Sequence, residues 1–258
     1  MTNKKVVPMD QKSKKYWEMK KTSDNDASIY IEGAIASDDD WSRGQDDTSA
    51  AQFRDDLKEL GNVSTIDLHI NSGGGSVFEG IAIYNMLKQN PAKINVHIDA
   101  LAASIASVIA MSGDTIFMPK NSMLMIHNPL TMVMGNAKEL RKQADDLDQI
   151  AKASRQSYLQ KTGDKLDEAT LETLLDEETW LTADEAVEYG LADVVEEANQ
   201  VAASVDKQYM QKYKHVPKQL IKKTTAKDEQ KERQEIMDHI QHLDEIEKQT
   251  NLILGGTK

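Results

Sequence analysis

Short apolar runs alternate with amphipathic stretches through the middle of the chain. Strand-like runs bounded by turn-forming residues cover residues 28–35, 65–70, 93–100, 115–119 and 122–129. Helical periods lie between them at residues 49–60, 77–90 and 101–113. Strands that alternate with helices form βα units around a mostly parallel, buried sheet. The pattern therefore predicts an α/β fold.

A longer helical pattern follows at residues 136–161, with large apolar residues on one helical period. Its many charged residues predict that much of this helix projects from the core. Two shorter helices are expected at residues 166–178 and 183–190.

The two ends of the chain differ from this central body. Residues 1–26 are polar and lysine-rich without periodicity, which predicts a flexible basic arm before a globular domain at residues 27–198. Residues 199–258 are expected to form a linker and a charged helical tail. Five apolar residues from Ile236 to Ile253 follow coiled-coil spacing, and both a solvated helix and an oligomerisation helix remain open.

Composition narrows the classes of protein. The 258 residues carry a formal net charge of −12, and residues 22–200 hold 13 basic against 32 acidic groups. An acidic body repels phosphate backbones, which disfavours duplex nucleic acid as a partner. The sequence contains no cysteine, so disulfides, thiolate metal sites and cysteine nucleophiles are excluded. No two histidines have metal-ligand spacing, and we expect neither a metal nor a cofactor.

The hydropathy of the chain favours a soluble protein. No apolar run reaches about 18 residues, and the N-terminal residues lack the apolar centre of a signal peptide. We therefore expect no membrane association and a cytoplasmic location.

A glycine-rich turn, NSGGGS at residues 71–76, lies between a predicted strand and a predicted helix. Main-chain N–H groups at such a turn can bind an anion or a developing oxyanion. The three glycines also let another backbone approach closely, which suits a bound peptide. Because no G-x-x-x-x-G-K-[ST] motif is present, nucleotide binding is weakly supported. A plain βα turn remains the simpler explanation of the glycines alone.

Two residues further along the chain carry possible chemistry. Ser104 follows a predicted strand and begins a helix of small residues, a turn that can present a hydroxyl beside main-chain N–H groups. His127 lies at the end of the apolar run MLMIH. The end of a strand at a sheet edge is a position from which a side chain can act as a general base. Taken singly, a helix cap and a packed histidine explain these residues. Together with the glycine turn they are the parts of serine acyl transfer, which needs an acid as well.

The segments NSGGG, AASIAS, MIHNP and ETWLTADEAVEYGLAD, in this order and spacing, resemble the Clp protease proteolytic subunit family. They resemble more closely its bacteriophage relatives that act as head maturation proteases. The resemblance covers about residues 28–197. It implies a Clp/crotonase-like fold of stacked ββα (βαβ) units, from which the long helix at residues 136–161 projects as a handle.

The resemblance also implies roles for single residues. Ser104 would be the nucleophile and His127 the general base. The N–H groups of Gly75 and Ile105 would be the oxyanion donors. The mechanism would need no cofactor.

The catalytic acid of the Clp proteolytic subunits in bacteria, the hosts of these phages, is an aspartate, and this chain departs from them at the corresponding position. Here the position holds Glu178, and Asp176 and Glu177 remain open as alternatives.

The resemblance further implies how substrate binds. A peptide would lie along an edge strand formed by NPLTMVMG, residues 128–135, by β-augmentation. The residues expected to contact it are Gly73, Gly74, Leu130, Met132 and Met134. An ordinary buried strand is the alternative for this segment. Gly73 stands where the host enzymes have proline, which predicts a looser turn.

The function that follows is a serine endopeptidase that cleaves capsid, scaffold or portal precursor proteins during phage head maturation. It would work as a ring-type homo-oligomer in the host cytoplasm or inside the assembling prohead. Two alternatives are a general proteolytic subunit served by an unfoldase ATPase and a non-catalytic assembly module of the same fold. A crotonase acting on acyl-CoA is disfavoured by the serine and histidine at the protease positions.

Overall fold

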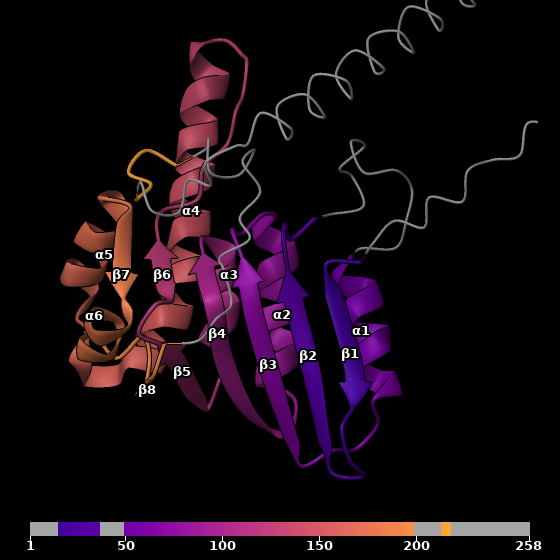
Figure 1. The fold of residues 1–258 in the computed structure, drawn as a ribbon. Coiled ribbons are helices and arrows are strands. Elements are labelled where there is room, and N and C mark those ends of the chain that lie inside the picture. The colour runs from indigo at the N-terminus through magenta and orange to yellow at the C-terminus, as the bar shows by residue number, and fades with distance from the viewer. Residues whose placement is uncertain (1–14, 37–48, 199–212, 218–258) are drawn as a thin grey trace, which may run out of the picture. The chain divides into compact units, whose positions relative to one another are not determined.

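The computed structural model describes residues 15–36, 49–198 and 213–217 (Figure 1). The chain divides into two compact units, residues 1–220 and 221–258, and every described residue belongs to the first. The expected coiled-coil stripe and most of the expected N-terminal arm lie outside the described residues. None of the helices in the described ranges combines the length and the apolar character that a membrane crossing needs.

One mixed sheet with helices against it makes up the described part of the chain. Its eight strands are β1 (Trp17–Lys21), β2 (Asp26–Glu32), β3 (Thr65–Ser72), β4 (Lys93–Ala103), β5 (Thr115–Pro119), β6 (Met123–Ile126), β7 (Thr179–Thr182) and β8 (Val194–Glu196). The helices are α1 (Ala50–Glu59), α2 (Val77–Lys88), α3 (Ile105–Ala110), α4 (Ala137–Thr162), α5 (Glu168–Asp176) and α6 (Ala183–Glu188), with a 3-10 turn at Gly163–Lys165. The predicted α/β class is confirmed.

The topology gathers several strand ends at one place. The strand order is β1-β2-β3-β4-β5-β8, and β6 pairs with both β4 and β7. All pairs are parallel except β1 with β2 and β6 with β7. The long strand β4 pairs with β5 through residues 95–97 and with β6 through residues 101–103. Because β3, β4 and β6 run parallel, their carboxyl ends lie at the same end of the sheet.

The main core lies between the sheet and the helices that cover one of its faces. Figure 1 shows α1, α2 and α3 behind the strands. Alternate strand residues such as Ile29, Leu68 and Val96 point to this side and are fully buried. Burial on this face fixes the register of the parallel strands, since a one-residue slip would expose the whole row.

The opposite face of the sheet carries a row of stacked rings. Tyr30, His69, His97 and Phe117 lie on β2, β3, β4 and β5, with successive ring centroids 4.6, 4.9 and 4.9 Å apart and nearly parallel planes. His69 Nδ1 also lies 2.9 Å from a carboxylate oxygen of Asp99. These rings are partly exposed, and the described helices α1, α2 and α3 lie behind the other face of the sheet in Figure 1.

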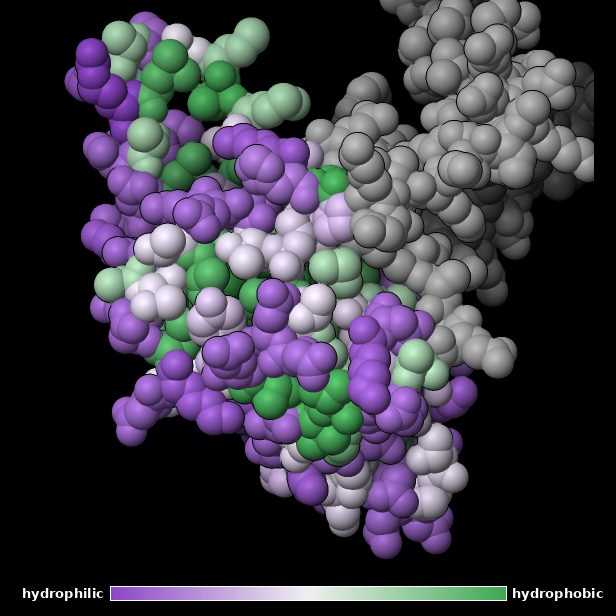
Figure 2. All heavy atoms as spheres, turned by 60° about the vertical axis from the view of Figure 1, so that its left-hand side comes forward, coloured by the Kyte–Doolittle hydropathy of each residue, from purple (hydrophilic) through white to green (hydrophobic). Residues whose placement is uncertain are grey.

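Helix α4 is the long charged helix that the sequence predicts. Asn136 caps its first turn, and Glu139 completes a capping box by accepting from the Asn136 N–H. Its N-terminal turns stand above the strands in Figure 1, as expected of a handle. Figure 2 shows hydrophobic side chains gathered at this tip, and the exposed large apolar residues there are Leu130, Met132, Val133, Met134 and Leu140.

Part of the predicted flexible N-terminal arm has regular structure. Residues 17–21 form β1, and Trp17 is buried against Phe53 with ring centroids 5.6 Å apart. The lysines around this strand hid its alternating pattern. Charged side chains are usual on an edge strand, because they discourage pairing with another chain.

The segments that follow β4 and β6 also differ from expectation. The helix predicted from residue 101 begins only at Ile105, because residues 101–103 are fully buried and continue β4 beside β6. Tertiary pairing here outweighs the helix propensity of alanine. Residues 128–135, expected to form an edge or buried strand, have no strand structure and are mostly exposed.

Candidate active site

The ends of neighbouring strands bring the predicted residues together. Ser104 directly follows β4, His127 directly follows β6, and the glycine turn follows β3. Because β6 and β7 are antiparallel with Ile126 opposite Thr179, the next pair outward is His127 and Glu178. The register of this strand pair therefore places a carboxylate beside the histidine.

Ser104 sits in a strained backbone conformation between β4 and α3. Its φ of 56° and ψ of −129° are uncommon for a residue other than glycine. The surrounding fold holds this turn, since the Ser104 N–H donates to the Met125 carbonyl at 2.9 Å. Strain of this kind is sustained at sites where a side chain must be presented.

A buried chain of hydroxyls supports the Ser104 turn from behind. The Ser107 hydroxyl donates to the Ser104 carbonyl at 2.6 Å and lies 2.6 Å from the Tyr158 hydroxyl of α4. Ser107 has a single hydroxyl proton, and the Ser104 carbonyl can only accept, so Tyr158 is the donor to Ser107. Burial raises the pKa of Tyr158, which keeps this hydroxyl protonated.

His127 is placed to remove the Ser104 proton. Its Nε2 lies 2.7 Å from the Ser104 Oγ. Burial lowers the pKa of His127, and the carboxylate of Glu178 opposes this by raising it. The imidazole is therefore held neutral near pH 7, which is the form that accepts a proton.

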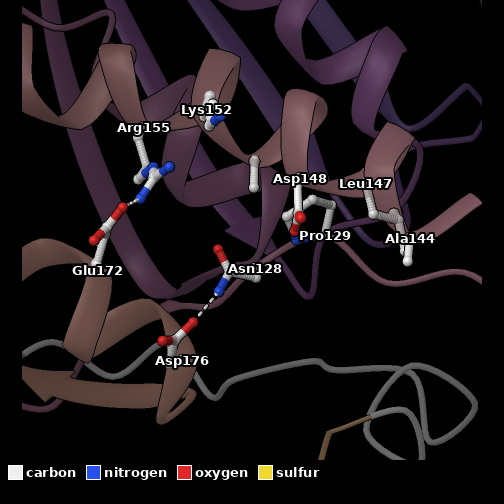
Figure 3. A pocket seen from close by; sticks show the side chains of 10 residues that line it. Asn128, Pro129, Ala144, Leu147, Asp148, Lys152, Arg155, Glu172 and Asp176 are labelled. Atoms are coloured by element: carbon white, nitrogen blue, oxygen red, sulfur yellow. Dashed lines mark hydrogen bonds and ion pairs between the residues drawn. The ribbon is translucent and has the colours of Figure 1, made fainter. Parts of the chain in front are cut away.

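Of the three candidate acids, Glu178 has the position that suits the histidine. It is buried, whereas Asp176 and Glu177 are exposed at the end of α5. Asp176 instead accepts a hydrogen bond from the Asn128 side chain at 2.5 Å, as Figure 3 shows. Glu178 also has a positive φ of 53°, so a second strained residue stands at this site.

The glycine turn lies close against the nucleophile and against residues 34–36. A Cβ on Gly74, whose φ is +92°, would lie 2.6 Å from the Ser104 Cβ. A Cβ on Gly75 would lie 2.0 Å from the Ile35 carbonyl oxygen. Ile35 bonds to Gly74 O and Ser76 N, so strand alternation directs the Gly75 N–H away from Ile35. This N–H is thus available as the predicted oxyanion donor.

An apolar hollow opens beside Ser104. Val77, Ile105, Val108, Pro129 and Leu175 supply its apolar lining. A second, more polar hollow shares Asn128 and Pro129 with it and runs between α4 and α5, where Arg155 pairs with Glu172 (Figure 3).

Not every predicted contact residue lies at the site. Gly73 and Gly74 are in the turn beside Ser104, but Leu130, Met132 and Met134 line neither hollow. Met132 and Met134 are each 97% exposed. Their role as substrate contacts stays a prediction.

Sequence reasoning missed several supporting residues. In the sequence, Ser107 fits a small packing residue and Tyr158 fits the apolar face of a helix. No local pattern marks Tyr213, whose ring contacts the His127 ring. In the described ranges, no three histidine or acidic side chains are grouped so as to hold a metal ion.

Comparisons with known proteins point to a single family. The Clp protease family model matches residues 42–199. Proteolytic subunit 1 of the ATP-dependent Clp protease of Protochlamydia amoebophila is 35% identical over 130 residues, which are 49% of this chain and 62% of that protein. The proteolytic subunit of Pleurastrum terricola is 35% identical over 145 residues, 55% of this chain and 69% of its own. Subunit 1 of Salinibacter ruber is 33% identical over 142 residues, 54% and 60% of the two chains.

These matches identify the family of this chain but not a narrower group within it. The chain spans 62% of the length of the Protochlamydia subunit, somewhat less than two thirds. These relatives are named as Clp proteolytic subunits, so a closer relationship to phage head maturation proteases stays a prediction. The family model covers more than half of the sequence and contains the glycine turn, Ser104, His127 and Glu178. The chain belongs to the Clp protease family.

Proposed function

We propose that the protein is a serine endopeptidase and that it works as the proteolytic subunit of a Clp-type protease. The observation that carries this proposal is the 2.7 Å contact between His127 Nε2 and the Oγ of a strained Ser104. A hydroxyl and a neutral imidazole at this distance form a nucleophile and its general base.

In this proposal the described residues perform acyl transfer in two halves. Ser104 attacks the peptide carbonyl while His127 takes its proton, and Glu178 stabilises the imidazolium that forms. The N–H groups of Gly75 and Ile105 bind the oxyanion of the tetrahedral intermediate. His127 then protonates the leaving amine, and water releases the acyl group by the reverse sequence. None of these steps needs a cofactor.

We further propose that the substrates are unfolded polypeptides delivered by an unfoldase ATPase. The relatives are named as subunits of ATP-dependent proteases, while this chain lacks the G-x-x-x-x-G-K-[ST] motif. The exposed apolar tip around α4 supports assembly into a homo-oligomer, because a patch of this kind is costly in water. The cytoplasm of the host cell is the compartment in which such a partner would act.

A fluorophosphonate probe tests the enzymatic proposal directly. The probe should label Ser104 in the full chain, and the Ser104→Ala and His127→Ala variants should not be labelled. Labelling of the Ser104→Ala variant at the original rate would contradict the proposed nucleophile.

The acid is tested by a matched pair of substitutions. Glu178→Gln keeps the shape but removes the charge next to His127, so labelling should fall by about two to four orders of magnitude. Asp176→Asn, two residues away and exposed, should change it little. The reverse result would assign the acid to Asp176.

The narrower prediction of phage head maturation has a separate test. Co-expression with a capsid, scaffold or portal precursor should yield cleaved precursor with the wild-type chain and intact precursor with Ser104→Ala. Degradation of unfolded proteins only with an added ATPase would instead favour the general Clp-type role.

A further inference from the structure

A short C-terminal segment, residues 213–217, lies against the catalytic groups from the side opposite the helices. Figure 1 shows it as the separate orange segment near the start of β7. The Tyr213 ring is 5.3 Å from the His127 ring and nearly perpendicular to it, and 6.0 Å from Trp180. It packs on a small apolar cluster formed by Leu101, Ala103 and Met125, separate from the main core. The segment thus covers the back of the strands that carry Ser104 and His127.

Two hydrogen bonds extend this contact to the remaining parts of the site. The Tyr213 hydroxyl donates to the carbonyl of Gly73, in the turn that holds the oxyanion donor Gly75. The His215 main-chain N–H donates to Glu178 Oε1 at 2.8 Å. Two residues of this five-residue segment, Tyr213 and His215, therefore contact the proposed base, the proposed acid and the oxyanion turn.

The segment does not line the apolar hollow beside the nucleophile. The apolar hollow beside Ser104 is lined by residues of α2, α3, α4 and α5 and of the chain after His127, and no residue of the segment lines it. The segment therefore does not form a wall of that hollow. The contacts of the segment are with the catalytic groups themselves and not with the lining of this hollow.

Two of the groups that the segment contacts have conformational freedom of their own. Gly73 has no side chain to restrict its backbone. Glu178 has three side-chain torsions, and a hydrogen bond from a main-chain N–H fixes its carboxylate without ordering a second flexible side chain. The Tyr213 ring also shields the His127 imidazole from water.

We propose that residues 213–217 position the catalytic groups, with Tyr213 as a positioning residue for His127 and the glycine turn and the His215 N–H as the anchor of Glu178. This proposal rests on the proposed serine endopeptidase function. Its consequence is that part of the chain beyond the matched family region is needed for full activity.

Substitutions of Tyr213 in the full-length chain test this role. Tyr213→Phe keeps the ring and removes the bond to Gly73, so the labelling rate of Ser104 should fall about fivefold. Tyr213→Ala should lower it more than tenfold, and kcat for a peptide substrate should fall while KM stays within about twofold. Lys214→Ala, an exposed neighbour, is the matched control and should behave as wild type.

The pH profile separates positioning from simple folding support. Burial lowers the pKa of His127, and Glu178 is the charged group that acts on it from the β7 side. Tyr213→Ala admits water to the imidazole, so the acidic limb of the labelling rate should move to higher pH, whereas Tyr213→Phe should leave that limb in place.

Two substitutions at position 215 isolate the main-chain bond. His215→Ala retains the N–H that Glu178 accepts and should label normally, whereas His215→Pro removes it and should label slowly. Thermal unfolding of each variant shows whether it is folded.

The proposal is overturned if Tyr213→Ala and Tyr213→Phe are folded and labelled at the wild-type rate. Faster labelling would also overturn it, and would make the segment an inhibitory cover. If the wild-type chain itself is not labelled, the proposed endopeptidase function fails first, so the two failures are distinguishable.

Discussion

The hydroxyl chain from Tyr158 through Ser107 to the Ser104 carbonyl gives a quantitative prediction. Ser107→Ala removes the bond to Ser104, worth about 1 kcal/mol, and leaves the Tyr158 hydroxyl buried without its acceptor, which costs about 1–3 kcal/mol more. The free energy of unfolding should therefore fall by about 2–4 kcal/mol. For a domain of this size the midpoint of thermal unfolding should drop by roughly 5–15 °C.

Removing the unpaired Tyr158 hydroxyl should restore part of the lost free energy of unfolding. The double variant Ser107→Ala with Tyr158→Phe should recover about 1–3 kcal/mol relative to Ser107→Ala alone, because no buried hydroxyl remains unpaired. Tyr84→Phe is the matched control: Tyr84 is also buried but donates to Gln160, away from the Ser104 turn.

The labelling rate of Ser104 distinguishes support of the turn from general stability. Ser107→Ala should lower the rate about tenfold or more, since the carbonyl of the strained residue loses its side-chain donor. Tyr158→Phe leaves that donor in place and should change the rate little. Two results together would refute the hydroxyl chain. The double variant would be destabilised by the full sum of its single substitutions, and Ser107→Ala would be labelled at the normal rate.

Three further predictions concern the turn, the base and the exposed tip. Gly74→Ala should abolish labelling because its Cβ would meet the nucleophile, whereas Gly33→Ala, at a similar φ with nothing within 4 Å, should not; equal effects would contradict the steric argument. The midpoint of the acidic limb of labelling should lie below pH 6.5, because burial lowers the pKa of His127 and favours the neutral base; a midpoint above 6.5 would exclude this. Met132→Glu with Met134→Glu should shift sedimentation to smaller species, and an unchanged mass would remove the tip from the oligomer interface.

The sequence was informative where a local pattern carries the structure. The alternating buried strands and the glycine turn are visible within short windows, because burial sets the period of each strand. Ser104 and His127 could be singled out because each lies near the end of an apolar strand pattern, and their roles as nucleophile and base came from the resemblance to the Clp family.

The parts that could not be predicted depend on contacts distant in sequence. The four-residue strand β7 exists because it pairs with β6, more than fifty positions earlier. Tyr213 reaches Gly73 across 140 positions, and nothing in its neighbourhood forms a period. The resemblance assigned the acid to Glu178 and left Asp176 and Glu177 open, because the β6–β7 register that sets Glu178 opposite His127 is not encoded in a local pattern.

The stacked rings on the sheet face opposite α1, α2 and α3 also offer a spectroscopic probe of the parallel strands. Each ring belongs to a different strand, and the ring planes of neighbours differ by 10°, 17° and 9°. Because aromatic rings shift the magnetic resonance frequencies of nuclei above and below them, the His69 and His97 signals would each report both neighbouring strands at once. Side chains point to alternate faces, so a slip of one residue would remove a ring from the row altogether. Two histidine side chains could thus follow the assembly of four strands as the protein folds.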